Sequence, residues 1–168
     1  MDIADIKKQS GKEHQVDEVQ VVEFIIGEDK FAVNLFDVRE IVEASRITPL
    51  PHAPTHVRGI IDLRGEITTI VDLRQLLQLK ATTNSEAADL RFIVLDDTVS
   101  RNKTGIVVDE VTSVLNVPIT DIDQATCGGE DGGHILGVIK KEIGERGESK
   151  KELIIWIDIR ELITKAGS

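Results

Sequence analysis

The seven residues "IDLRGEI", from Ile61 to Ile67, break a pattern that the chain otherwise repeats. In the regular copies an Asp is followed at the third position by Glu or Gln, and at the first, fourth and fifth positions by apolar residues. These copies are "FDVREIV" at 36–42, "VDLRQLL" at 71–77 and "IDIRELI" at 157–163. Such spacing is the stripe of an amphipathic helix. At 61–67 the third residue after the Asp is Gly65, a poor helix former, so we predict a hairpin there and helices elsewhere.

The regular copies also carry the signals of a helix start. An Asp at the first position can cap the backbone N–H groups, and a Glu or Gln three residues later can reach back toward the cap. The predicted caps are Asp37, Asp72 and Asp158, and the residues predicted to reach back are Glu40, Gln75 and Glu161.

The predicted hairpin places a charged side chain at its tip. Strand alternation sends Ile61 and Leu63 to one face and Asp62 and Arg64 to the other. Two interpretations of Arg64 remain open from these residues alone. Its guanidinium either meets a partner, or pairs with Asp62 or Glu66 on a solvated surface, where such a pair contributes less than about 1 kcal/mol.

Ten short β-like segments dominate the rest of the chain, five on each side of a polar joint at 81–89. They are 19–26, 30–35, 46–50, 57–63, 66–73, 90–96, 104–110, 111–117, 134–143 and 151–157. Short strands with Gly-rich turns favour small barrels over a helical bundle. We predict a mainly β fold with two barrels side by side. They span about 19–80 and about 90–157 and are flanked by a mobile tail at 1–18 and a helix at 158–165.

The charge and the apolar runs exclude several kinds of partner. Thirty acidic against twenty basic residues give a net charge of -10, which repels nucleic acid and anionic bilayers. Continuous apolar runs such as "LIIWI" are far shorter than the roughly 20 residues of a membrane span, so direct membrane insertion is not expected. A single Cys127 and the absence of a secretory apolar run in the first twenty residues predict a cytoplasmic protein.

No group of residues forms a catalytic pattern. His52 and His56 have metal-compatible spacing, but Pro51 and Pro54 disfavour the helix that would align them. The Gly-rich stretch "CGGEDGGHILG" has neither the P-loop nor the dinucleotide-binding spacing. We predict no enzymatic activity, no catalytic residue, no metal site and no cofactor.

The stretch "APTHVRGIIDLRGEITTIVDLRQLL" resembles the CheW family of chemotaxis coupling proteins. The resemblance extends over "FIIGEDKFAVNLFDVREIVEASRITPLPHAP", "TGIVVDEVTSVLNV" and the closing "ILGVIKKEI...ELIIWIDIRELI", and so covers roughly residues 19 to 164. It implies two five-stranded, SH3-like barrels without enzymatic activity. It also implies an adaptor that binds the regulatory domain of a CheA-type histidine kinase and the cytoplasmic tip of methyl-accepting chemoreceptors. Through receptor arrays the adaptor is expected at the inner face of the membrane.

The same resemblance implies which residues couple the partners. Those that match receptor-coupling positions of the family are Val38, Glu40, Gly59 and Arg64, and those that match coupling positions for kinase or receptor are Gly105 and Val111. The chain departs from the family pattern at Asp62, where Asn is usual, and at Thr69, where Pro is common. Two alternatives stay open: an adaptor of this family with a different output, such as surface motility, and a small barrel domain that binds a metabolite.

Overall fold

The computed structural model describes residues 17–79, 90–124, 134–143 and 150–166. The tail at 1–16, the joint at 81–89 and Cys127 lie outside these ranges. Within them the chain is mainly β, with short helices at a few strand ends.

The strands are β1 (Glu18–Ile26), β2 (Asp29–Asn34), β3 (Val38–Glu43), β4 (Val57–Leu63), β5 (Glu66–Asp72), β6 (Arg91–Leu95), β7 (Thr104–Val108), β8 (Glu110–Pro118), β9 (Ile122–Asp123), β10 (Ile135–Ile143) and β11 (Lys150–Ile157). The helices are α2 (Leu73–Leu76), α3 (Ile159–Ala166) and the 3-10 turns η1 (Leu35–Asp37) and η3 (Ile119–Asp121).

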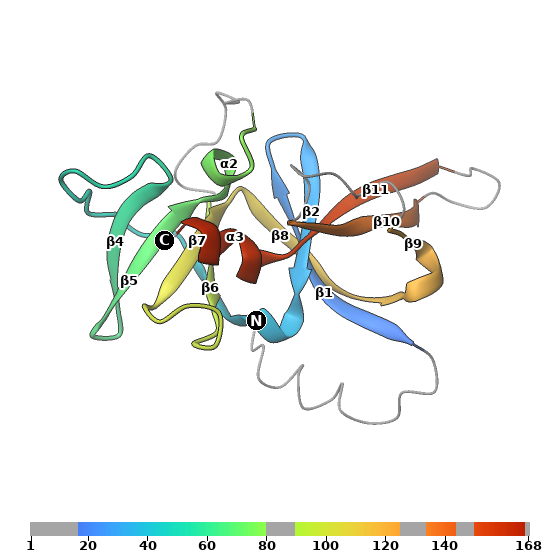
Figure 1. The fold of residues 1–168 in the computed structure, drawn as a ribbon, viewed down its shortest axis with the longest axis horizontal. Coiled ribbons are helices and arrows are strands. Elements are labelled where there is room, and N and C mark those ends of the chain that lie inside the picture. Colours follow the sequence, from blue (N-terminus) through green and yellow to red (C-terminus); the bar gives the residue numbers. More distant parts are fainter. Residues whose placement is uncertain (1–16, 80–89, 125–133, 144–149, 167–168) are drawn as a thin grey trace.

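Two sheets form the molecule, as expected, but they do not follow the consecutive ranges predicted for the barrels. A six-stranded sheet has the order β8-β1-β2-β11-β10-β9, and a five-stranded sheet has the order β3-β6-β7-β5-β4 (Figure 1). We call them sheet A and sheet B. Sheet A combines β1 and β2, from the beginning of the chain, with strands from its second half. Strand β8 pairs with β1, and β11 adds parallel to β2. Sheet B is completed by β6 and β7 from beyond the polar joint.

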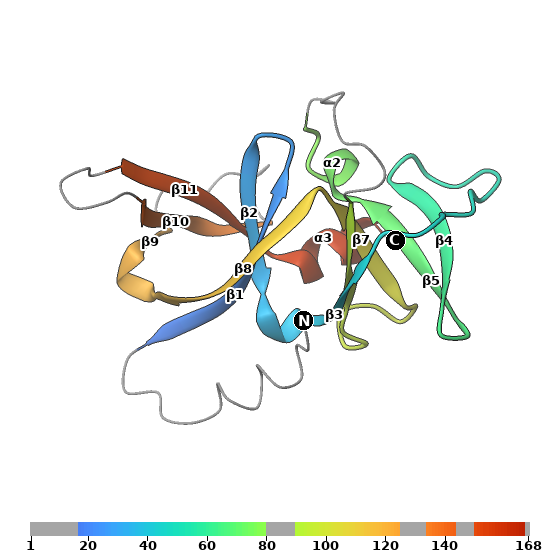
Figure 2. The same cartoon turned by 180° about the vertical axis from the view of Figure 1, so that it is seen from behind.

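Among the residues that the structure describes, the buried apolar side chains form three clusters. The largest, here called the central core, includes Phe24, Phe31, Ile93 and Ile106 and therefore joins strands of both sheets. A second cluster lies within sheet A around Trp156, and a third lies within sheet B around Phe92. The view from behind shows β8 running beside β1 in sheet A (Figure 2).

Two of the three predicted helices are confirmed. The carboxylate of Asp72 accepts a hydrogen bond from the Arg74 N–H at 2.9 Å, and α2 begins there. Asp158 accepts from the Glu161 N–H at 3.2 Å at the start of α3. Helix α3 buries Ile159, Leu162 and Ile163 in the central core and lies between the sheets in Figure 1.

The helix predicted for "FDVREIV" at 36–42 is wrong. A single 3-10 turn ends at Asp37, and the chain continues as β3, which pairs with β6. A bulge between Val38 and Glu40 shifts which side chains face each side of the strand. The apolar residues therefore have the spacing of a helix although they lie in a strand. No helix follows Asp37 for it to cap, and its buried carboxylate accepts a hydrogen bond from Arg160 Nε at 2.7 Å.

The predicted strand at 46–50 is reduced to one bridge. Thr48 and Ile60 exchange backbone hydrogen bonds of 2.8 and 2.9 Å. Since Thr48 follows β3 and Ile60 belongs to β4, the bridge connects the two edges of sheet B and closes it into a barrel.

Sheet A contains a buried carboxylate. Glu23 of β1 is only 1% exposed, and its Oε2 accepts hydrogen bonds from Ser113 Oγ at 2.9 Å and Lys141 Nζ at 3.4 Å. Burial by itself raises the pKa of Glu23, but the bond from Ser113 and the charges of Lys141 and Lys30 outweigh it and hold the pKa below the usual 4.5. The ionised group therefore links β1 to β8 and β10.

We expect Glu23 to make the free energy of unfolding depend on pH. Because its pKa is lower in the folded than in the unfolded chain, its contribution is complete above about pH 4.5 and is lost as the pH falls through the folded value. Glu23→Gln should therefore flatten the decline in unfolding free energy between pH 6 and pH 3, measured by urea denaturation. Glu28→Gln, at an exposed turn position, is the matched control. Parallel curves for wild type and Glu23→Gln would show that the carboxylate contributes nothing as an ion.

Candidate functional site

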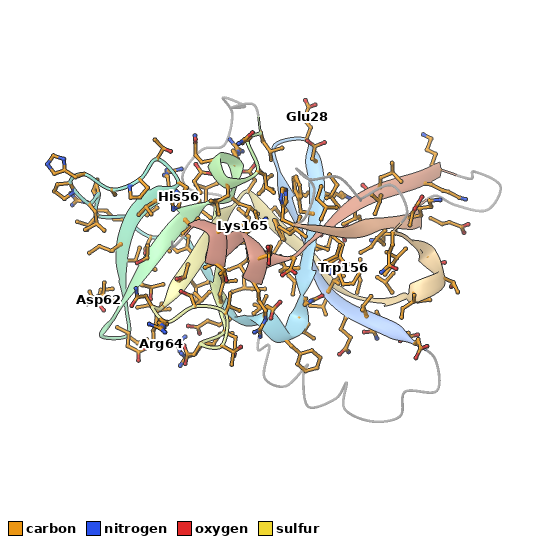
Figure 3. The ribbon with its side chains drawn as sticks, in the orientation of Figure 1. Glu28, His56, Asp62, Arg64, Trp156 and Lys165 are labelled. Atoms are coloured by element: carbon orange, nitrogen blue, oxygen red, sulfur yellow. The ribbon has the colours of Figure 1, made fainter. Side chains whose placement is uncertain are left out.

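The hairpin predicted at the broken repeat is present. Strands β4 and β5 pair up to Leu63 and Glu66, which leaves Arg64 and Gly65 as a two-residue turn. Both have positive φ, 53° and 83°, as a type I′ turn requires. Asp62 Oδ1 accepts the Gly65 N–H at 2.8 Å and so braces the turn. In Figure 3 Asp62 and Arg64 lie at this tip of the molecule.

The ion pair of Arg64 is made with a different residue from those expected. Its Nη2 donates to Glu40 Oε2 at 2.7 Å, not to Asp62 or Glu66. Asp62 accepts from the turn, and Glu66 binds Lys103, whose hydrogen bond lowers the pKa of Glu66. Glu40 lies on β3, the strand at the opposite edge of sheet B, so the barrel closure brings the pair together.

Three ion pairs surround a small depression at this end of sheet B. Arg39 lies 3.4 Å from Asp97, and the pairs Arg64–Glu40 and Lys103–Glu66 complete the group. The depression measures about 70 Å³, and its remaining lining is Leu63, Thr68, Val94 and Leu95. This volume is well below the roughly 300 Å³ at which small-molecule sites begin. We call the surface formed by the three pairs the charged rim.

Of the six candidate residues, only Glu40 and Arg64 come together at the surface. Val38 is fully buried in the central core, and Val111 is half-buried against it. Gly105 lies in β7 where an added Cβ would be 3.3 Å from Ile70 Cδ1. Val38 and Gly105 thus lie inside the fold, and Val111 lies partly inside it.

Gly59 has a structural role at the bridge that closes sheet B. Its φ is 145°, and an added Cβ would lie 2.2 Å from the carbonyl oxygen of Thr48. Only glycine allows the two backbones to approach closely enough for the bridge that closes sheet B.

Four residues of the charged rim were not among the candidates: Arg39, Glu66, Asp97 and Lys103. One signal was visible: every copy of the repeat has an Arg two residues after its Asp, and each of these arginines forms an ion pair. The partners are 24 to 123 residues away, which no local pattern reveals.

Other kinds of site find little support in the part of the chain that the structure describes. No three His, Cys, Asp or Glu side chains are grouped there so that they could hold a metal ion. None of the helices in that part is long and apolar enough to cross a membrane.

Comparison with known proteins points to one family. A family model for the CheW-like domain matches residues 20–167. The chemotaxis protein CheW of Rhizobium meliloti (strain 1021) is 36% identical over 103 residues, covering 61% of this chain and 64% of the relative, a little under two thirds of its length. The chemotaxis protein CheW of Thermotoga maritima is 28% identical over 149 residues and covers 87% of this chain and 88% of the relative.

A solved structure agrees with the fold. The crystal structure of the scaffolding protein TtCheW from Thermoanaerobacter tengcongensis superposes with a TM-score of 0.71. The two chains are 26% identical, and the match covers 89% of this chain and 90% of that chain.

We expect Gly59→Ala to lower the free energy of unfolding by more than about 2 kcal/mol, because it combines strained backbone with a clash at the Thr48 carbonyl. Gly65→Ala is the matched control, since its φ is also positive but nothing lies within 4 Å of the added Cβ. That change should cost about 1 kcal/mol, because a Cβ is disfavoured in the left-handed region. Chemical denaturation measures both, and equal losses would contradict the close approach at Gly59.

Proposed function

The chain belongs to the CheW-like domain family, and from this membership we propose that it is a non-catalytic adaptor of chemotaxis signalling. In this proposal it couples a CheA-type histidine kinase to methyl-accepting chemoreceptors, and binds the regulatory domain of the first and the cytoplasmic tip of the second. It acts in the cytoplasm and is held at the inner face of the membrane through the receptor array.

The observation that carries the proposal is the placement of Arg64. Its side chain is 74% exposed although one nitrogen is bound to Glu40. A guanidinium has five N–H donors in a rigid fork, so most of its donors remain available to a carboxylate or carbonyl of a partner. The turn fixes the position of Arg64, and the hydrogen bond to Glu40 orients its guanidinium group.

The ion pair with Glu40 contributes little to folding. Exposed pairs are typically worth less than about 1 kcal/mol, because solvent screens the charges and two side chains lose freedom. A partner carboxylate that replaces Glu40 therefore breaks no large interaction. At the charged rim Arg64 can exchange the carboxylate of Glu40 for a carboxylate of the partner.

An exposed apolar side chain in the same hairpin favours a protein partner. Ile67 is 59% exposed on β5 and lies opposite Asp62 in the hairpin register. Interfaces combine such apolar contacts with an Arg that makes directed hydrogen bonds. A helix at the receptor tip that presents aliphatic and acidic or carbonyl groups fits this surface.

We expect Arg64→Glu to weaken receptor binding at least tenfold while the melting curve changes little. A central interface Arg is worth about 2 kcal/mol or more, whereas an exposed turn residue changes stability by about 0.5 kcal/mol. The measurements are co-sedimentation with receptor-bearing membranes, binding to the kinase regulatory domain and thermal unfolding. Arg46→Glu makes the same charge change at another exposed position and serves as the control.

A charge swap separates an internal role from a contact. In Arg64→Glu combined with Glu40→Arg the internal pair can form again with its charges exchanged. If the pair only braces the fold, the swap restores receptor binding, and the proposal for Arg64 fails. If the fork meets the receptor, binding stays weak in the swapped chain although its melting temperature matches wild type.

A further inference from the structure

The depression at the charged rim is the mouth of the barrel that sheet B forms. Thr68 of β5 lines it and pairs with Ile61 of β4, which is buried in the apolar cluster within sheet B. Ile70, two residues further on the same face of β5, belongs to that cluster as well. The depression therefore leads from the apolar interior of the barrel to the surface at Arg64. Barrel mouths are among the places where ligand sites occur.

Thr68 has a buried hydroxyl group without a partner. Its side chain is fully buried, and its Oγ1 forms no hydrogen bond to any residue that the structure describes. A buried hydroxyl has lost its bonds to water, and this loss is offset only when another polar group replaces them. Valine has nearly the same shape and would fill the position without that loss. Folding alone therefore does not explain a hydroxyl at position 68.

A second unfavourable feature lies at the same depression. Arg64 occupies the first position of the type I′ turn with a φ of 53°, where Asn, Asp and Gly are preferred. The backbone of an arginine is strained in this left-handed region. Local features that oppose folding concentrate at functional sites. Two of them, at Arg64 and Thr68, line this one depression.

The charges around the depression are balanced. It is lined by three cations and three carboxylates, which are Arg39, Arg64, Lys103, Glu40, Glu66 and Asp97. Each cation is bound to one of the carboxylates. An ion that entered would lack a free counter-charge, whereas a neutral group needs none. Since the same side chains offer both hydrogen-bond donors and acceptors, a neutral group that carries one of each is matched best.

The volume of the depression limits what can enter it. About 70 Å³ corresponds to roughly two water molecules at about 30 Å³ each. The depression is therefore suited to the end of one side chain. A carboxamide has this size, is neutral, and carries both donors and an acceptor. Asn and Gln present this group, and a helix can direct it toward the surface at Arg64.

We propose that the depression receives the carboxamide of one Asn or Gln side chain of the protein partner, and that Thr68 selects it. This contact rests on the proposed function and lies beside the contact assigned to Arg64. Because Thr68 Oγ1 is closed to solvent, the exposed pair Arg64–Glu40 opens first, which costs little. Thr68 Oγ1 then donates to the amide oxygen, and the amide N–H donates to Glu40, the acceptor that Arg64 has released.

Acetamide, a carboxamide with a single methyl group, is the probe, and it is titrated into the full chain while NMR spectra are recorded. Saturable shifts are expected at the backbone amides of Thr68 and Leu95, which line the depression. Acetate and methylammonium have a similar size but carry a charge. They should bind at least tenfold more weakly, because the balanced rim offers no free counter-charge to either.

Thr68→Val removes only the hydroxyl. It should weaken acetamide binding at least threefold, the loss expected for one hydrogen bond, and raise the melting temperature, because an unpaired buried group is gone. Opposite effects on binding and stability distinguish a ligand contact from a structural role. Thr69→Val is the matched control, since the side chain of Thr69 faces the other side of β5 and does not line the depression. Its acetamide affinity should equal that of wild type.

The same two variants are compared by co-sedimentation with receptor-bearing membranes. Thr68→Val should bind these membranes at least threefold more weakly than wild type, whereas Thr69→Val should bind them equally well. This comparison tests whether the protein partner uses the depression.

Three results would overturn the proposal. The first is acetamide binding no tighter than the binding of acetate or methylammonium. The second is unchanged acetamide affinity in Thr68→Val. The third is wild-type binding of Thr68→Val to receptor-bearing membranes. If wild type itself does not bind these membranes, the proposed function fails, and the acetamide titration alone decides whether the depression is a carboxamide site.

Discussion

Strand β1 is buried on both of its faces, and this ties the two sheets to each other. Val22, Phe24 and Ile26 face the central core, while Val21 faces the apolar cluster within sheet A. A strand with two buried faces cannot leave either cluster without exposing the other to water. Because strands of sheet B contribute to the same central core, the two sheets form one packed unit although they share no strand.

This packing supports the proposed role of the short turn at Arg64. The tip at Arg64 is held by Asp62, by the pair with Glu40 across the closed barrel, and by the bridge that Gly59 permits. A group that is already fixed in its bound position loses little freedom on binding, so more of its interaction energy appears as affinity. Buried candidates such as Val38 and Gly105 support this surface from inside the fold.

The sequence was most informative where structure is local. The hairpin at Arg64 and Gly65 and the caps at Asp72 and Asp158 depend on residues within a few positions of one another. The repeat at 36–42 carries the same local signals as the two true helices, yet pairing with β6 makes it a strand. The partner of Asp37 is Arg160, which lies 123 residues away. The interleaving of the sheets and the members of the charged rim have the same non-local origin.

The central claim, that the two sheets fold as one unit around the central core, can be tested by equilibrium unfolding in urea with two probes. Trp156 reports on the cluster within sheet A, and fluorine-labelled Phe92, followed by NMR, reports on the cluster within sheet B. A shared core predicts that both signals change in a single transition with the same midpoint and slope. Separate midpoints, with one sheet melting while the other stays folded, would show that the two sheets do not share one cooperative core.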